Sequence, residues 1–213
     1  MIPTQVLIVE DDPMTRTLFE IYLKNSERYV LAGSIESASM AELYCLTRQV
    51  DLIIMDVCTA FHASGLIAAE KIKKNHPRIK ILMVTSQPEC DFINRAKAAG
   101  VDSFWYKDSP SGDLIDVIEG TLSGKHFWPD SVPAVQLGKA LSCDLSDQEL
   151  ETLRLLCEGK TNSEIAAKLH VAESSVRTYI NRMLEKTGYS NRNRLMVAAV
   201  GKRLVVPGNQ LDD

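Results

Sequence analysis

The first 124 residues alternate short apolar runs with longer stretches whose apolar residues have helical spacing. Each of five runs has the length and composition of a buried strand: 5–9, 29–32, 52–55, 79–84 and 103–106. Short, fully apolar strands that alternate with amphipathic helices predict a parallel sheet covered by helices on both faces. We therefore expect an α/β domain built from five strand and helix units.

The first predicted helix follows directly on the first strand. Asp12 suits the N-cap position, and Pro13 suits the first helical position, where the missing N–H of proline would have no partner. Apolar residues then follow at helical spacing: Met14, Leu18, Ile21 and Tyr22. This spacing predicts a helix after the acidic turn.

Polar and charged residues follow four of the five predicted strands. They are Glu10, Asp11 and Asp12 after the first strand, Asp56 after the third, Thr85 and Ser86 after the fourth, and Lys107 after the fifth. Ligands of open parallel sheets bind at the carboxyl ends of the strands. We therefore expect these side chains to converge on Asp56, although each has an ordinary explanation as a cap, strand end or surface residue.

The chemistry of these residues fits phosphoryl transfer. Asp11 and Asp56 can share a hard divalent cation, with Glu10 reaching it directly or through water, and oxygen ligands of this kind suit Mg²⁺. Asp56 can attack phosphorus as a carboxylate nucleophile and form an acyl phosphate. Lys107 and Thr85 can each bind a phosphoryl oxygen.

Two enzyme classes fit these residues less well. A phosphate-binding loop at Gly124 and Lys125 is rejected, because His126 stands where Ser or Thr would bind magnesium and the segment ends a helix. An aspartate-nucleophile phosphatase usually has a second acid two residues after the nucleophile, where this chain has Cys58. A phosphatase is therefore a weak alternative, and we expect no enzyme.

Composition predicts a protein of the cytoplasm. The sequence has no apolar run of membrane-spanning length and no secretory leader, so no membrane partner is expected. The cysteines are odd in number and scattered, which predicts reduced thiols: Cys45, Cys58, Cys90, Cys143 and Cys157.

The composition changes between residues 125 and 143. Pro129 and Pro133 interrupt a stretch without sustained periodicity, which predicts a linker between domains. Phe127 and Trp128 are too apolar for a free tether, so we expect them to pack on one of the two domains. The predicted domains cover 1–124 and 144–207, and a tail covers 208–213.

The second domain is predicted to be an all-α domain of four helices. Ser146 with Glu149, and Thr161 with Glu164, form two capping boxes that open the first two helices. A tight connection leads to a third helix at about 173–187, and a last helix follows at about 191–202. Two helices joined by so short a turn predict a helix-turn-helix.

The segment from Gly159 to Arg203 has nine basic and three acidic residues, a net charge of +6. This predicts nucleic-acid binding, with a solvated helical face as the alternative. By helical geometry Arg177, Thr178 and Asn181 face the major groove of double-stranded DNA. Three further basic residues are candidate phosphate contacts: Lys160, Arg182 and Lys186.

Residues 1–124 resemble the receiver domain of bacterial two-component response regulators. The resemblance maps the acidic pair onto Glu10 and Asp11, the phosphoacceptor onto Asp56, the switch hydroxyl onto Thr85 and the lysine onto Lys107. It makes Phe104 the switch aromatic and implies that the backbone carbonyl of Cys58 is a metal ligand. It also implies a sensor histidine kinase as the phosphodonor.

The segment GKTNSEIAAKLHVAESSVRTYINRMLEKTG resembles the DNA-binding domain of LuxR-type regulators. With the receiver, this resemblance implies a NarL/FixJ-type response regulator whose last helix forms a homodimer, for which Val197 and Val200 are available. The leading hypothesis is a transcription regulator controlled by phosphorylation of Asp56. The alternative is a DNA-binding protein whose receiver is a constitutive dimerisation or docking module.

The sequence departs from the family pattern at several positions. Thr59 and Ala60 stand where methionine and proline are usual, and the loop to Gly65 is slightly extended. Ala172 occupies an N-cap position where Ser or Thr is common, which predicts a loss of about 1 kcal/mol. Tyr179 stands where histidine is frequent.

Overall fold

The computed structural model describes residues 3–89, 91–107 and 114–206. The chain divides into two compact units, the first containing residues 1–86 and 91–130 and the second containing residues 87–90 and 131–213. Three predicted features lie outside the described residues: the thiol of Cys90, the start of the helix expected from about Ser111, and the tail.

The first unit contains the predicted parallel sheet. Its strands are β1 (Thr4–Val9), β2 (Tyr29–Ile35), β3 (Leu52–Asp56), β6 (Lys80–Thr85) and β7 (Ser103–Tyr106). Their order is β2-β1-β3-β6-β7, and every neighbouring pair is parallel. The prediction of a five-stranded parallel α/β fold is confirmed.

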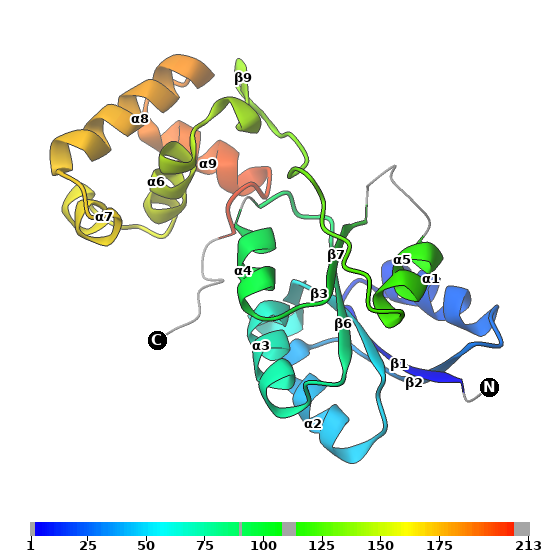
Figure 1. Ribbon diagram of the computed structural model, residues 1–213. Helices are drawn as coiled ribbons and strands as arrows, with labels where there is room; N and C mark the ends of the chain where they lie inside the picture. Colours follow the sequence, from blue (N-terminus) through cyan, green and yellow to red (C-terminus); the bar gives the residue numbers. More distant parts are fainter. Residues whose placement is uncertain (1–2, 90, 108–113, 207–213) are drawn as a thin grey trace. The chain divides into compact units, whose positions relative to one another are not determined.

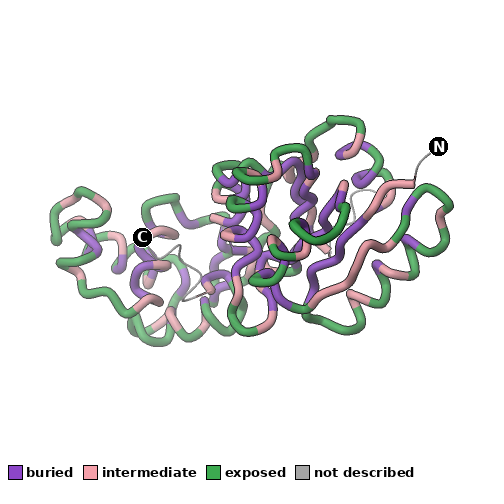
Figure 2. The backbone as a smooth tube through the Cα atoms, turned by 90° about the horizontal axis from the view of Figure 1, so that it is seen from below, coloured by how far each residue is buried: buried purple, intermediate pink, exposed green. Residues whose placement is uncertain are grey.

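Helices cover both faces of this sheet, as Figure 1 shows. They are α1 (Pro13–Lys24), α2 (Ala41–Thr47), α3 (Gly65–Asn75), α4 (Phe92–Ala98) and α5 (Leu114–Leu122). α1 and α5 lie on one face, and α2, α3 and α4 lie on the other (Figure 1). The inner strands β1 and β3 are largely buried between these layers, whereas β2 is only partly buried at the edge (Figure 2).

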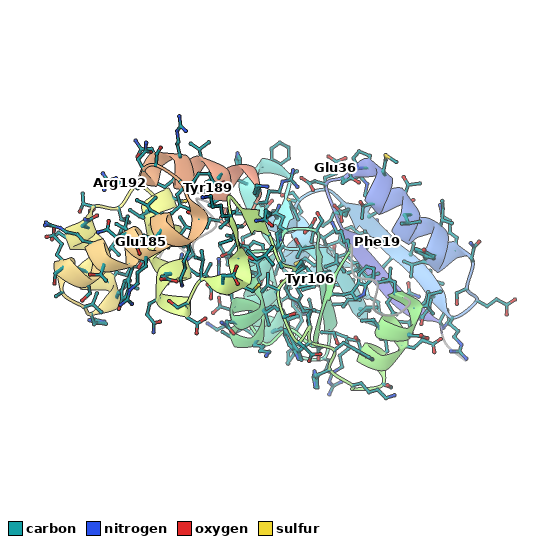
Figure 3. All side chains as sticks on the ribbon, turned by 90° about the horizontal axis from the view of Figure 1, so that it is seen from above. Phe19, Glu36, Tyr106, Glu185, Tyr189 and Arg192 are labelled. Atoms are coloured by element: carbon teal, nitrogen blue, oxygen red, sulfur yellow. The ribbon has the colours of Figure 1, made fainter. Side chains whose placement is uncertain are left out.

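The buried face of α1 is not the one that the apolar spacing suggested. Phe19, labelled in Figure 3, and Leu23 are the buried residues of this helix. The residues singled out by spacing are exposed by 37% to 83%: Met14, Leu18, Ile21 and Tyr22. α1 therefore carries apolar side chains on two faces, of which one packs on the sheet.

The structure contains two short hairpins that the sequence did not predict. The first joins β4 (Cys58–Thr59) to β5 (Ala63–Ser64) through the 3-10 turn η2 (Ala60–His62). The second joins β8 (Gln136–Leu137) to β9 (Ala140–Leu141), inside the range predicted as a linker. Leu137 is completely buried in the core of the second unit.

The second unit is predominantly helical. Its helices are α6 (Asp147–Cys157), α7 (Asn162–Leu169), α8 (Glu173–Thr187) and α9 (Arg192–Gly201). Both predicted capping boxes are formed, at the starts of α6 and α7. The 3-10 turn η3 (Ser142–Asp144) precedes α6 in this unit, and another, η1 (Ala38–Met40), precedes α2 in the first unit. None of the described helices is long and apolar enough to cross a membrane.

Candidate functional site

Three of the predicted site residues meet at one edge of the sheet. Glu10 directly follows β1, Asp56 ends the neighbouring strand β3, and Lys107 directly follows β7. The Lys107 Nζ atom lies 2.6 Å from Glu10 Oε2 and 2.7 Å from Asp56 Oδ2. All three side chains are at most 13% exposed. Lys107 is 97 positions from Glu10 and 51 positions from Asp56 in the sequence. The three residues meet because parallel strands bring their carboxyl ends to one edge of the sheet.

Burial shapes the electrostatics of this cluster. Burial, together with the charge of Asp56, raises the pKa of Glu10 to about 7 against the opposing hydrogen bond and charge of Lys107. Burial likewise raises the pKa of Asp56 above its ordinary value, although Lys107 opposes the change. Burial alone would lower the pKa of Lys107, but its two carboxylate partners raise it, so the amine stays charged. The carboxylates outnumber the lysine, so the cluster favours an additional cation.

The chemistry of the acidic group fits a divalent metal ion. Carboxylate oxygens of Glu10, Asp11 and Asp56 lie within 4.8 Å of one another. Asp11 is exposed, which leaves one side of the group open to solvent, while the other two are buried. Mg²⁺ prefers oxygen ligands and retains several waters, so a half-open carboxylate group suits it. The predicted ligand Cys58 lies beside the group, and its N–H donates to Asp56 Oδ1 at 3.4 Å.

Thr85 ends β6, the strand next to β3, and Phe104 lies on β7, one strand further along the sheet. Thr85 is completely buried at the end of β6, and its carbonyl accepts a hydrogen bond of 2.9 Å from the N–H of Lys107. Tyr106 is opposite Thr85 in the strand register, and Phe104 lies two residues earlier on the same strand. Phe104 is 1% exposed and makes an edge-to-face contact with Tyr106 at a centroid distance of 5.3 Å. The two predicted switch residues thus lie on adjacent strands, two register positions apart.

The sequence marks Thr59 as unusual but does not indicate its role, which is to anchor the loop after Asp56. The Thr59 hydroxyl donates to Ala63 O at 2.8 Å and accepts from Ala38 N at 2.9 Å. The N–H of Ala60 donates to Glu36 O at 3.0 Å, and the Ser37 hydroxyl donates to Ala60 O at 3.2 Å. The loop is therefore fastened to the segment that follows β2.

Two backbone features complete this loop. A side chain at Gly65 would place its Cβ 2.0 Å from the carbonyl oxygen of Asp56, so only glycine fits there. At the tip, Phe61 and His62 have φ values of 61° and 58°, in the left-handed region that few non-glycine residues adopt. The Phe61 side chain is 88% exposed. The extended loop is thus a defined hairpin with an aromatic residue at its tip.

The second unit presents the predicted recognition residues to solvent. α7 and α8 are joined at His170, whose φ of 53° makes the tight turn. Val176 and Ile180 are buried on the inner face of α8. The predicted base-reading residues and two phosphate contacts are exposed: Arg177, Thr178, Asn181, Arg182 and Lys160. The Arg177 Nη2 atom lies 2.6 Å from Glu173 Oε1 in an exposed ion pair, which is weak enough for the arginine to exchange partners.

Lys186 differs from the other predicted phosphate contacts. Its Nζ atom lies 2.7 Å from Glu149 Oε2 and 2.9 Å from Asp144 O. The Glu149 side chain is 3% exposed, so the pair joins α8 to the start of α6. These contacts give Lys186 a structural role that the sequence did not indicate, while its prediction as a phosphate contact stays a prediction.

Two further predictions concern the start of α8 and the exposed face of α9. Ala172 is the N-cap of α8 and makes no side-chain cap hydrogen bond, as the sequence indicated. On α9, Leu195 and Ala199 are buried, whereas Val197 is 74% and Val200 is 39% exposed. Both valines are therefore available to a partner.

Comparisons with known proteins cover nearly the whole chain. Residues 6–119 match the family described as the response regulator receiver domain, and residues 144–199 match the bacterial regulatory proteins of the luxR family. The response regulator protein VraR of Staphylococcus aureus is 30% identical over 94% of this chain and 98% of its own length. VraR of Staphylococcus epidermidis is 29% identical with the same coverage.

Solved structures with the same fold include regulators bound to DNA. RcsB from Salmonella enterica serovar Typhimurium, bound to promoter rprA in the presence of the phosphomimetic BeF3−, has a TM-score of 0.60 and 22% identity. The match covers 92% of this chain and 97% of that one. Another RcsB–DNA complex has a TM-score of 0.62 and 21% identity over 93% of this chain and 98% of that one. At these identities the likeness is one of fold.

Proposed function

Because this chain belongs to the response regulators that join a receiver domain to a LuxR-type DNA-binding domain, we propose that phosphorylation of Asp56 controls its binding to DNA. The observation that carries the proposal is the cluster of Lys107, Glu10 and Asp56 at the carboxyl edge of the sheet. The proposed receiver covers residues 1–124, the linker 125–143 and the DNA-binding domain 144–207.

The phosphoryl step uses residues with distinct roles. An Asp56 oxygen attacks the phosphorus of a phosphohistidine on a sensor kinase; the P–N bond breaks as the P–O bond forms, and the imidazole leaves. Lys107, already 2.7 Å from Asp56, then binds a phosphoryl oxygen, and the Thr85 hydroxyl binds another. Mg²⁺ held by Glu10, Asp11, Asp56 and the Cys58 carbonyl would offset the negative charge of the incoming phosphate.

The DNA-binding step rests on the exposed face of α8. Arg177, Thr178 and Asn181 read bases in the major groove of double-stranded DNA, while Arg182 and Lys160 contact phosphates. Val197 and Val200 on α9 pair two copies into a homodimer, which matches a twofold DNA site.

Labelling with acetyl phosphate tests the phosphoacceptor. The wild type should incorporate phosphate in the presence of Mg²⁺, and Asp56→Asn should not. Asp116→Asn, which changes an exposed carboxylate on α5, is the matched control and should label normally. Equal labelling of wild type and Asp56→Asn, or none in either, would contradict phosphorylation control.

A second candidate function follows from the loop after Asp56. Thr59 and Ala60 depart from the family pattern, and the loop tip exposes Phe61. These features favour a receiver that acts as a docking or dimerisation module without phosphorylation. DNA binding by an unlabelled protein that is unchanged in Asp56→Asn supports this alternative.

A further inference from the structure

The residues that follow α5 pack along the edge strand β7. The N–H of Phe104 donates to Phe127 O at 2.8 Å, and the N–H of Phe127 donates to Ser103 Oγ at 3.1 Å. The Nδ1 atom of His126 lies 2.7 Å from Asp102 O. We call residues 126–128 the edge segment; Figure 1 shows the chain running beside β7 after it leaves α5. The segment thereby supplies partners to backbone groups that an edge strand would leave unpaired.

Consecutive side chains of the edge segment lie on opposite sides of β7, as expected for extended chain. Phe127 packs on the α5 side, where a Cβ at Gly120 would lie 2.2 Å from its ring. Trp128 stacks on Phe104, with ring centroids 6.5 Å apart and planes inclined by 22°. The Lys97 Nζ atom of α4 lies 5.2 Å from the centroid of the Trp128 ring. The linker thus begins with two aromatic anchors, and one of them covers the switch aromatic.

Contacts between aromatic rings lead from the edge segment toward the phosphate site. Trp128 contacts Phe104, Phe104 contacts Tyr106, and Tyr106 lies opposite Thr85 in the strand register. Side chains in a close-packed interior move together, because a ring cannot turn into space that another ring fills. Phe104 therefore cannot change its position without a change in its contact with Trp128.

We propose that Trp128 is a positioning residue that holds Phe104 in its unphosphorylated arrangement, and that phosphorylation of Asp56 releases this stacking. The inference rests on the proposed function. It identifies a linker residue whose contact with the receiver changes on phosphorylation. Because coupling is reciprocal, a contact that favours the unphosphorylated arrangement weakens binding of a phosphoryl group by the same factor. Loss of the stacking should therefore strengthen the binding of a phosphoryl mimic.

The chain offers a direct spectroscopic test, because its two tryptophans are Trp105 and Trp128. In Trp105→Phe, the full-length protein keeps Trp128 as its single tryptophan. Adding Mg²⁺ and BeF3− should shift the emission of Trp128 and saturate with the loading of the site, and Asp56→Asn in the same background should remove the response. Site loading followed independently by ¹⁹F NMR, with no change in Trp128 emission, would overturn the inference. Absence of loading itself would count against the proposed function instead.

Substitution of Trp128 gives the second measurement. Trp128→Leu should bind BeF3− about threefold to tenfold more tightly, the range expected when one aromatic pair is lost. Trp128→Phe keeps a ring on Phe104 and should restore most of the wild-type affinity. Phe127→Leu is the matched control: it shortens the neighbouring anchor on the other side of β7 and should lower stability without changing BeF3− affinity. Equal BeF3− affinity of wild type and Trp128→Leu would contradict the proposal.

Discussion

The hydroxyl of Thr59 accepts a hydrogen bond of 2.9 Å from the backbone N–H of Ala38, and so ties the loop after the phosphoacceptor to the segment after β2. Thr59 is 5% exposed, and its hydroxyl also donates to Ala63 O. The loop lacks the usual proline, and this buried hydroxyl is one of the contacts that fix its shape.

Thr59→Val keeps the shape of the side chain but leaves the N–H of Ala38 and the carbonyl of Ala63 without this partner. We expect unfolding in urea to show a loss of about 1–3 kcal/mol, and labelling by acetyl phosphate to slow because the neighbouring Cys58 is less well fixed. Thr59→Ser retains the hydroxyl and should recover most of the stability and most of the labelling rate. Equal labelling rates in Thr59→Val and Thr59→Ser would show that the Thr59 hydroxyl does not affect phosphorylation.

Ala172→Ser should stabilise the DNA-binding domain by about 1 kcal/mol, because a serine hydroxyl can accept from a backbone N–H in the first turn of α8, where alanine offers no acceptor. Thermal unfolding measures the effect. Ala167→Ser, at an exposed position inside α7, is the control and should be neutral or slightly destabilising. A stabilisation of equal size in both variants would show that capping is not the cause.

Arg182→Ala should weaken DNA binding and reduce the slope of log affinity against log salt by about one, as expected for a lost phosphate contact. Lys186→Met should leave that slope unchanged and lower stability by about 1–2 kcal/mol, because it breaks the bond to the buried Glu149 carboxylate. Binding titrations at several salt concentrations, combined with urea unfolding, separate the two roles. A reduced salt slope in Lys186→Met would show that Lys186 contacts a DNA phosphate.

Asp102 should make stability depend on acid pH. Burial alone would raise its pKa, but hydrogen bonds from Lys73, Lys80 and the N–H of Ile81 outweigh burial and lower it. The folded pKa therefore lies below the unfolded value of about 3.9, so this stabilisation is complete above that pH and is lost as the pH falls through the folded pKa.

Urea unfolding of Asp102→Asn between pH 7 and pH 3 tests this account. The variant should be less stable at pH 7 by on the order of 3 kcal/mol, because two lysines lose their shared partner, and the difference from wild type should shrink in acid. Asp116→Asn, at an exposed position, should follow the wild type throughout. A difference that stays constant with pH would assign the effect to packing.

The sequence by itself determined the five strands, the capped helices and the set of residues at the strand ends, because these depend on local periodicity and on short-range hydrogen bonds. Glu10, Asp56 and Lys107 could be assigned to one site since parallel strands end at a common edge. The buried Val176 and Ile180 of α8 likewise follow from helical spacing. The local pattern was sufficient to predict the buried residues wherever a helix or strand has only one apolar face.

Only the tertiary structure decided which apolar face of α1 is buried, how Thr59 fixes the loop, where Trp128 packs and which partner Lys186 has. Each of these depends on contacts between residues distant in sequence, such as the 21 positions between Thr59 and Ala38 or the 42 between Lys186 and Asp144. A side chain with several possible partners takes the one that folding brings within hydrogen-bond or van der Waals distance. The spacing of residues along the chain cannot predict these partners, because the packing of whole helices and strands against one another determines them.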